Sequence, residues 1–293
     1  MALDGIEVNS DMATVLERQQ AAQIDGGIPS AEKRIDWIDR CIGLLVDHRT
    51  EIEEAIAEDF GHRSMDMSRF TETASSIAAL KFAKKHLKSW MRVDRRRTEF
   101  PFGLLGARSE VQFQPKGVVG IISPWNFPVN LTFTPLAGVI AAGNRAMIKP
   151  SEFTEHTSAL MKVMFAKAFA DDEISVFTGG PNVGAAFSAL AFDHLIFTGA
   201  TSVAKHVMRA AAENLVPLTL ELGGKSPVIL GASANMKKAA NRILAGKTMN
   251  AGQICLAPDY AFVPASQVQT FIGHATTAVE SMYPSGIKDN DDY

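Results

Sequence analysis

From residue 118 onward, the chain alternates between short apolar runs and longer stretches with helical periodicity. The apolar runs cover residues 118–122, 146–148, 174–177 and 194–197, and each is closed by Gly, Pro, Ser or Thr. Nearly continuous apolar strands that alternate with helices are typical of βαβ units around a parallel sheet covered on both faces. The pattern therefore predicts an α/β fold whose ligands bind beyond the carboxyl ends of the strands.

The first third of the chain has a helical pattern instead. Apolar residues recur at helical spacing from Ile35 to Leu45, and Ser30 before them is a suitable N-cap. The pattern continues from Ile52 to Phe60, and Gly61 is expected to end it. A second helical run is expected over residues 71–91. Basic residues and an alternating apolar segment then replace the helical pattern, which predicts an extended arm or hairpin over residues 94–115.

The composition excludes several classes of function. The net charge is only −3 and the charged residues are mixed, which gives no electrostatic basis for nucleic acid or membrane as a partner. Polar residues and a proline interrupt the longest apolar stretch, so no membrane span is expected. The chain has two cysteines, Cys41 and Cys255, and no metal-ligand spacing. Together with the lack of a signal peptide, this predicts a cytoplasmic protein without a metal.

Polar residues follow the predicted strands where a ligand would bind. Two prolines bracket Asn126 and would hold its amide in a fixed direction, from which it could donate to a developing oxyanion. Lys149 offers donors, and Glu152 could accept from ribose hydroxyls. Each residue also has an ordinary alternative: Asn126 could satisfy backbone groups, and Glu152 could interact with a helix dipole.

A small turn that contains glycine, at residues 197–202, joins a predicted strand to a helix. Such a turn lets a cofactor approach backbone N–H groups at a helix N-terminus. The turn lacks the GxGxxG pattern, so an ordinary strand-to-helix connection explains this segment equally well.

Two further residues have the chemistry that covalent catalysis needs. Small residues surround Cys255, and a thiolate is a strong nucleophile once its pKa is lowered. Glu221 lies in an otherwise apolar predicted strand before a Gly-Gly pair. Apolar surroundings raise the pKa of a carboxyl group, which suits a general base. Unreactive buried thiols and edge-strand glutamates are common, so neither residue decides the function alone.

Five motifs occur in a characteristic order. They are PWNFP at 124–128, KPSE at 149–152, FTG at 197–199, LELGGKSP at 220–227 and GQIC at 252–255. In order and spacing they resemble the motifs of the aldehyde dehydrogenase superfamily, and the likeness covers residues 30–264. Residues 121–126 and 255–260 resemble its class 3 branch, and residues 61–76 are most similar to the coniferyl aldehyde dehydrogenases.

The resemblance implies a mechanism for three of these residues. Cys255 would attack an aldehyde to give a thiohemiacetal, whose oxyanion would be held by the Asn126 amide and the Cys255 backbone N–H. Transfer of a hydride to the nicotinamide would leave a thioester, and Glu221 would activate the water that hydrolyses it. The expected reaction is NAD(P)-dependent oxidation of an aldehyde, of the aromatic coniferyl type, to the carboxylic acid.

The resemblance also assigns nucleotide-binding positions. They are Trp125, Lys149, Glu152, Gly180, Gly184, Thr198, Gly199, Ala200, Val203 and Leu222. Glu152 favours NAD because a 2′-phosphate would meet its carboxylate, and Lys149 nearby leaves NADP open. Ala200 departs from the family pattern, in which serine is usual at this position.

The implied organisation is a Rossmann-like NAD(P)-binding domain followed by the start of a second α/β domain. The first comprises residues 1–93 and 116–218, and residues 94–115 form a bridging and oligomerisation arm. Residues 219–293 form the N-terminal part of the catalytic domain. Members of the family continue for well over a hundred residues further, so the resemblance implies that this domain is incomplete here. It implies a homodimer for a full-length chain.

Three alternatives stay open at this stage. The substrate could be a medium-chain or long-chain aliphatic aldehyde. The chain could be inactive and only bind nucleotide. It could also be a cysteine-based acyl-transfer or thiol-redox protein, although no plausible histidine partner for Cys255 stands out.

Overall fold

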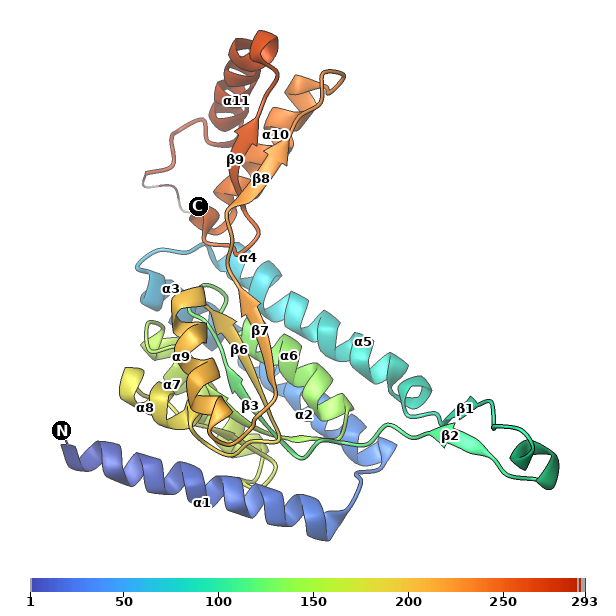
Figure 1. Cartoon of the computed structure of the whole chain (residues 1–293). Helices are drawn as coiled ribbons and strands as arrows, with labels where there is room; N and C mark the ends of the chain where they lie inside the picture. The colour runs from blue at the N-terminus through green and yellow to red at the C-terminus, as the bar shows by residue number, and fades with distance from the viewer. Residues whose placement is uncertain (1, 289, 291–292) are drawn as a thin grey trace.

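A five-stranded parallel sheet forms the centre of the molecule in the computed structural model, which describes residues 2–288, 290 and 293 (Figure 1). The strand order is β5-β4-β3-β6-β7, and every neighbouring pair is parallel. The strands are β3 (Val118–Ile122), β4 (Arg145–Lys149), β5 (Ile174–Val176), β6 (His194–Gly199) and β7 (Leu218–Leu222). The α/β class and the first four strands are therefore confirmed.

The order of the strands places a topological switch point beside β3. Ile122 at the end of β3 pairs with Lys149 of β4 on one side and with Phe197 of β6 on the other. The chain runs outward from β3 to β5, and then returns to add β6 and β7 on the opposite side. Ligands of open parallel sheets bind in the crevice at such a point, outside the carboxyl ends of the strands.

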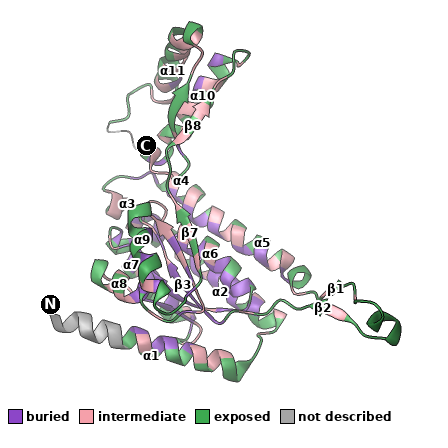
Figure 2. Cartoon of the chain, in the orientation of Figure 1, coloured by how far each residue is buried: buried purple, intermediate pink, exposed green. Residues whose placement is uncertain are grey.

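Helices cover both faces of the sheet because alternate strand residues point to opposite faces. Val119 and Ile121 belong to one apolar core and Val118 belongs to the other, and Figure 2 shows these buried layers on the sheet. The first core packs under α2 (Ala31–Asp47), α3 (Arg49–Phe60), α5 (Ser75–Trp90), α6 (Asn130–Ala141) and α7 (Glu155–Ala168). The second packs under α1 (Ala2–Gly26), α8 (Pro181–Ser188) and α9 (Thr201–Ala212). None of the described helices is both long and apolar enough to cross a membrane.

The N-terminal helices begin and end largely where the sequence predicts. The Ser30 hydroxyl accepts from the Lys33 N–H at the start of α2, as expected of an N-cap. Gly61 ends α3 in the left-handed conformation, with φ of 71°. The second helical run differs from the prediction, because the short α4 (Met65–Ser68) continues into a π-helix (Arg69–Ala74) before α5 begins. Such π-helical segments frequently occur at functional sites.

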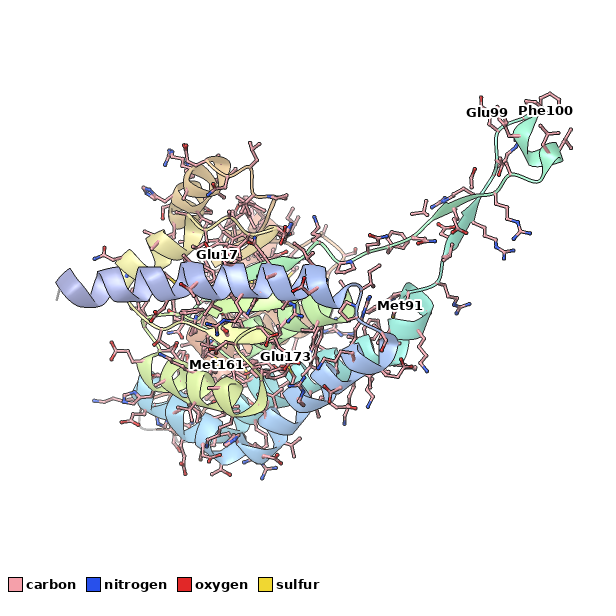
Figure 3. The ribbon with its side chains drawn as sticks, turned by 90° about the horizontal axis from the view of Figure 1, so that it is seen from below. Glu17, Met91, Glu99, Phe100, Met161 and Glu173 are labelled. Atoms are coloured by element: carbon pink, nitrogen blue, oxygen red, sulfur yellow. The ribbon has the colours of Figure 1, made fainter. Side chains whose placement is uncertain are left out.

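The expected arm is present as a two-stranded hairpin. Strands β1 (Asp94–Arg96) and β2 (Ser109–Val111) pair antiparallel and enclose a 3-10 helix, η2 (Phe102–Leu105). Figure 3 shows the hairpin reaching away from the body of the molecule, with Glu99 and Phe100 at its far end. Its apolar side chains are exposed, so the arm has no core of its own.

The last part of the chain forms a small unit beyond β7. It pairs β8 (Ser226–Ile229) parallel with β9 (Pro258–Phe262) and packs α10 (Met236–Thr248) against α11 (Val268–Met282). Two 3-10 turns, η3 (Met249–Gly252) and η4 (Ala265–Gln267), complete it. Strand β7 leads directly into this unit. The expected boundary between the cofactor domain and the catalytic domain, at residues 218 and 219, therefore lies inside a strand of the central sheet.

Candidate active site

The carboxyl edge of the sheet gathers the loops that carry the expected site residues. The Ser123 N–H donates to the Lys149 carbonyl at 3.1 Å, which places the loop after β3 beside the loop after β4. The register pairs Thr198 with Glu221 and Gly199 with Leu222, so β6 and β7 end side by side. Residues that lie up to a hundred positions apart in sequence thus share one edge of the sheet.

Lys149, Glu152 and Gly184 meet at the end of β4. The buried Lys149 ammonium donates to the Glu152 carboxylate at 2.7 Å. A Cβ atom on Gly184 would lie 3.7 Å from Lys149 Cε, so the lysine side chain passes over this glycine. Burial disfavours the ionised form of Glu152, but the hydrogen bond and charge of Lys149 outweigh it and lower the pKa of Glu152. This corner therefore offers a cation, a carboxylate and free backbone surface to a ligand.

Two helix N-termini without side-chain caps point to the same edge. Gly180 is the N-cap of α8 and Ala200 is the N-cap of α9, and no side chain caps either helix. Val203, in the first turn of α9, is exposed. A Cβ atom on Gly199 would lie 2.7 Å from Phe197 Cζ, because the phenyl ring occupies that space. Uncapped N–H groups at helix N-termini attract phosphate groups, which fits the resemblance-based expectation for these residues.

Asn126 bridges the sheet edge and the small C-terminal unit. Its side-chain Nδ2 donates to the Gln253 carbonyl at 2.8 Å. Its own carbonyl accepts from Arg63 Nη1 at 3.0 Å and from Asn250 Nδ2 at 3.1 Å. Trp125, the preceding residue, is 40% exposed. The amide of Asn126 is thus held in one direction, toward the loop that carries Cys255.

That loop has an unusual backbone. Asn250, Ala251 and Gly252 all have positive φ angles, of 48°, 53° and 74°. Non-glycine residues adopt this conformation uncommonly, so the surrounding structure must hold it. The Gln253 N–H donates to the Asn250 carbonyl at 2.9 Å and closes the turn. The turn presents Cys255 to solvent, where its thiol is accessible.

Glu221 does not have the apolar surroundings that the sequence predicts, and that expectation is wrong for the described chain. Strand β7 lies at the edge of the sheet, and its side chains alternate between half-buried and exposed. Leu220 and Leu222 pack against the second core, whereas Glu221 lies on the opposite, exposed face.

Glu221 lies in β7, five residues before β8, and Cys255 lies three residues before β9. Strands β8 and β9 are parallel, and Ser226 pairs with Pro258 at their beginnings. Lys225 and Asp259 form an ion pair of 3.3 Å at this end. Glu221 and Cys255 precede these positions by a few residues, so the topology supports a shared site for the carboxylate and the thiol.

Comparison with known proteins identifies the family of this chain. A family model described as the aldehyde dehydrogenase family matches residues 9–292. This chain belongs to the aldehyde dehydrogenase family. A probable coniferyl aldehyde dehydrogenase of Caulobacter vibrioides is 63% identical over 96% of this chain and 58% of that protein. Rat aldehyde dehydrogenase family 3 member B1 is 35% identical over 92% of this chain and 57% of its own length.

Solved structures of aldehyde dehydrogenases share the fold. The substrate-bound state of Staphylococcus aureus AldH superimposes with a TM-score of 0.91 and 35% identity, over 96% of this chain and 60% of that one. An aldehyde dehydrogenase of Mycobacterium tuberculosis complexed with NAD+ superimposes with a TM-score of 0.82 and 26% identity, over 93% and 56%. This aldehyde dehydrogenase chain thus spans less than two thirds of the length of the relatives that it matches.

The structure adds three residues to the site of this aldehyde dehydrogenase chain that motif reasoning did not select. They are Arg63, Glu72 and Asn250, which hold the Asn126 segment. Glu72 lies in the run that is expected to be helical, where charged residues usually face solvent, and Arg63 precedes that run. Arg63 and Glu72 lie within residues 61–76, where the resemblance assigned them no role, and Asn250 lies two residues before the GQIC motif.

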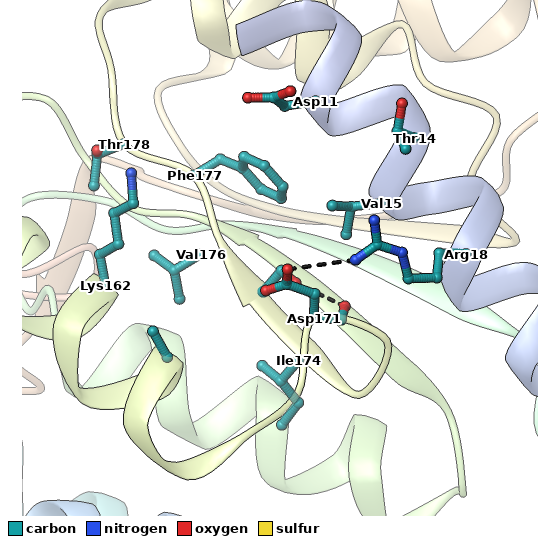
Figure 4. A pocket seen from close by; sticks show the side chains of 12 residues that line it. Asp11, Thr14, Val15, Arg18, Lys162, Asp171, Ile174, Val176, Phe177 and Thr178 are labelled. Carbon is teal, nitrogen blue, oxygen red and sulfur yellow. Dashed lines mark hydrogen bonds and ion pairs between the residues drawn. The ribbon is translucent and has the colours of Figure 1, made fainter.

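A cavity of about 330 Å³ lies between α1, α7 and β5 (Figure 4). Arg18 and Asp171 form an ion pair of 3.5 Å in its lining, to which Phe177 and Thr178 also belong. None of the expected catalytic or cofactor residues lines it. In the described part of this aldehyde dehydrogenase chain, no group of three or more His, Cys, Asp or Glu side chains is arranged to hold a metal ion.

Proposed function

We propose that this chain carries the nucleotide-binding and nucleophile-bearing part of an NAD(P)-dependent aldehyde dehydrogenase. The observation that carries the proposal is the hydrogen bond from the Asn126 amide to the loop of Cys255. It ties a donor at the carboxyl edge of the parallel sheet to the Gln253 carbonyl, two residues before the accessible Cys255 thiol. Acyl chemistry on cysteine needs a donor near its nucleophile.

In this proposal, Cys255 adds to the aldehyde carbonyl and forms a thiohemiacetal. The Asn126 amide and the Cys255 backbone N–H donate to the oxyanion that develops. A bound nicotinamide would supply the hydride acceptor for the carbon that Cys255 holds. The remaining thioester is hydrolysed by a water that the Glu221 carboxylate deprotonates, which releases the carboxylic acid.

The cofactor is proposed to lie along the carboxyl edge of the sheet, and the residues present there fit a dinucleotide. Lys149 and Glu152 would hold the adenosine ribose, because they lie together at the end of β4. Gly180 and Ala200, at the uncapped N-termini of α8 and α9, would face phosphates. The lowered pKa of Glu152 keeps its carboxylate charged, which disfavours a 2′-phosphate and supports NAD over NADP.

We infer the domain organisation and assembly from the same family relation. Residues 1–93 and 116–218 would form the cofactor domain, and residues 219–293 would belong to the catalytic domain. The exposed apolar arm, residues 94–115, would contact a second copy in a homodimer. The cytoplasm is the proposed compartment. An aromatic aldehyde of the coniferyl type is the proposed substrate, because the relative with 63% identity carries that name.

Substitution of Asn126 tests the catalytic proposal. Asn126→Ala should bind NAD with unchanged affinity and lose turnover by about 10²–10³-fold, which is typical for removal of one oxyanion donor. The measurement is NADH formation with an aromatic aldehyde, compared with a medium-chain aliphatic aldehyde. Unchanged turnover in the variant would remove Asn126 from the mechanism, and preference for the aliphatic substrate would overturn the aromatic assignment.

A chain that only binds nucleotide is the second candidate, and the exposure of Glu221 favours it. NAD binding by titration without NADH formation from any aldehyde would establish this candidate. Formation of NADH that depends on Cys255 would exclude it.

A further inference from the structure

A buried ion pair lies behind the segment that carries Asn126. The Arg63 and Glu72 side chains are 4% and 0% exposed, and Arg63 Nη1 lies 3.2 Å from Glu72 Oε1. We infer that Arg63, supported by Glu72, is a positioning residue that fixes Asn126 in the direction needed for oxyanion stabilisation. The inference rests on the proposed function, since it presumes that Asn126 donates to the oxyanion.

The Arg63 guanidinium is fixed in one orientation by four contacts besides Glu72. Nη1 donates to the Asn126 carbonyl at 3.0 Å, and Nη2 donates to Thr71 Oγ1 at 3.1 Å. The rings of Phe60 and Phe127 lie 4.9 Å and 5.0 Å from its central carbon. A planar group with several donors suits such a site, and a lysine ammonium could not reproduce its two directed bonds and ring contacts.

Glu72 holds the other end of the same segment. Its Oε2 accepts from the N–H groups of Val129 at 3.1 Å and Asn130 at 2.7 Å, where α6 begins. A carboxylate is favourable at a helix N-terminus. The ion pair therefore holds residues 126–130 by hydrogen bonds at two places. Arg63 bonds to the Asn126 carbonyl, and Glu72 bonds to the N–H groups at the start of α6.

The same hydrogen bonds continue to the loop that carries Cys255. The Asn126 carbonyl has two lone pairs, and it accepts from both Arg63 and Asn250. The Asn126 amide in turn donates to the Gln253 carbonyl, two residues before Cys255. One continuous set of hydrogen bonds and ion pairs thus runs from Glu72 through Arg63 to the turn that presents the thiol.

Hydrogen exchange measured by mass spectrometry on the whole chain separates this role from a general effect on stability. Arg63→Lys should increase exchange about tenfold or more in peptides that cover residues 125–131 and 250–257, since a charge-assisted hydrogen bond is lost. Peptides from β3 and β4 should be unchanged. Arg69→Lys is the matched control, because Arg69 pairs with Glu53 at 2.9 Å in the adjoining helix but does not contact the Asn126 segment. Unchanged exchange at residues 125–131, or an equal increase everywhere, would overturn the inference.

A second, milder variant tests the same inference if Arg63→Lys does not fold. Thr71→Val keeps the shape of the side chain and removes the hydroxyl, which accepts from Arg63 Nη2 and donates to the Met67 carbonyl. It should increase exchange in the same two regions by a smaller factor. If both regions keep wild-type exchange in Thr71→Val, the inference is overturned as well.

Steady-state kinetics test whether the contacts of Arg63 and Glu72 with the Asn126 segment affect turnover. Arg63→Lys should lower kcat by about tenfold, with the aldehyde KM and the NAD affinity unchanged, and should cause no further loss when combined with Asn126→Ala. Additive losses in the double variant would show that Arg63 does not act through Asn126. Full turnover in Asn126→Ala alone would instead refute the proposed function. The exchange data would still decide whether Arg63 holds the Asn126 segment in place.

Discussion

Replacement of Glu72 by glutamine should change how the stability of this chain depends on pH. Burial raises the pKa of Glu72 from its ordinary value of 4.5 to about 7, against the opposing effects of Arg63 and the N–H groups of Asn130 and Val129. The folded chain therefore keeps a proton on Glu72 at pH values where the unfolded chain has released it. Glutamine has nearly the same shape and cannot titrate, so Glu72→Gln removes this linkage.

The sign follows from the number of bound protons. Below pH 4.5 both states are protonated, and the contribution of Glu72 to stability is fully present. As the pH rises from 4.5 through about 7, the folded state binds more protons than the unfolded state, and the free energy of unfolding falls. Because each pKa unit corresponds to about 1.36 kcal/mol, the total loss is about 3 kcal/mol. Above that window the contribution stays constant.

The assay is urea unfolding followed by tryptophan fluorescence, for both proteins, at several values between about pH 4 and pH 8. The advantage of the wild type over Glu72→Gln should shrink by about 3 kcal/mol across this range. Glu173→Gln is an informative control. Burial opposes ionisation of Glu173, but hydrogen bonds from Arg40, Lys33 and Trp37 outweigh it and hold its pKa well below the ordinary value. Its contribution should therefore be lost as the pH falls below about 4.5. A wild-type advantage over Glu72→Gln that stays flat or grows with pH would refute the reasoning.

Three further predictions concern the thiols, the cofactor and the core. Iodoacetamide should modify the exposed Cys255 in the native chain and leave Cys41, which is buried and has a raised pKa, unmodified until denaturant is added; peptide mass spectrometry that finds native Cys41 alkylated would contradict this. Lys149→Met should raise the Kd for NAD by about tenfold or more in a fluorescence titration, because a buried cation is lost; an unchanged Kd would exclude Lys149 from the cofactor site. Phe133→Ala should destabilise the chain by about 3–5 kcal/mol in urea unfolding, since its ring is fully buried and stacks on Phe165 at 5.1 Å; a cost below about 1 kcal/mol would show that the core is not packed as described.

Local sequence patterns predicted the parts of the fold in which neighbouring residues decide the structure. The apolar run at residues 118–122 became β3 with the same bounds, because a strand buried on both faces must be apolar throughout. Ser30 and Gly61 mark helix ends through their own hydrogen bond and backbone angle. The motif residues at the ends of β3, β4 and β6 share one edge because parallel strands bring their carboxyl ends together.

The sequence patterns did not predict contacts between segments that are far apart in the chain. Nothing in the sequence near Arg63 shows that it meets the Asn126 carbonyl, since that contact spans 63 positions. Glu221 is another example, because its apolar neighbours suggested burial and only the edge position of β7 explains its exposure. The helical periodicity of this region likewise does not predict the π-helix at residues 69–74.

The sequence by itself determined the α/β class and the family, because these depend on periodicity and on the order of motifs. The tertiary structure decided what surrounds each functional side chain. It placed the Asn126 amide on the loop of Cys255, a buried ion pair behind it, and Glu221 in the open. The physical reason is that burial and hydrogen-bond partners are set by the packing of segments far apart in the chain.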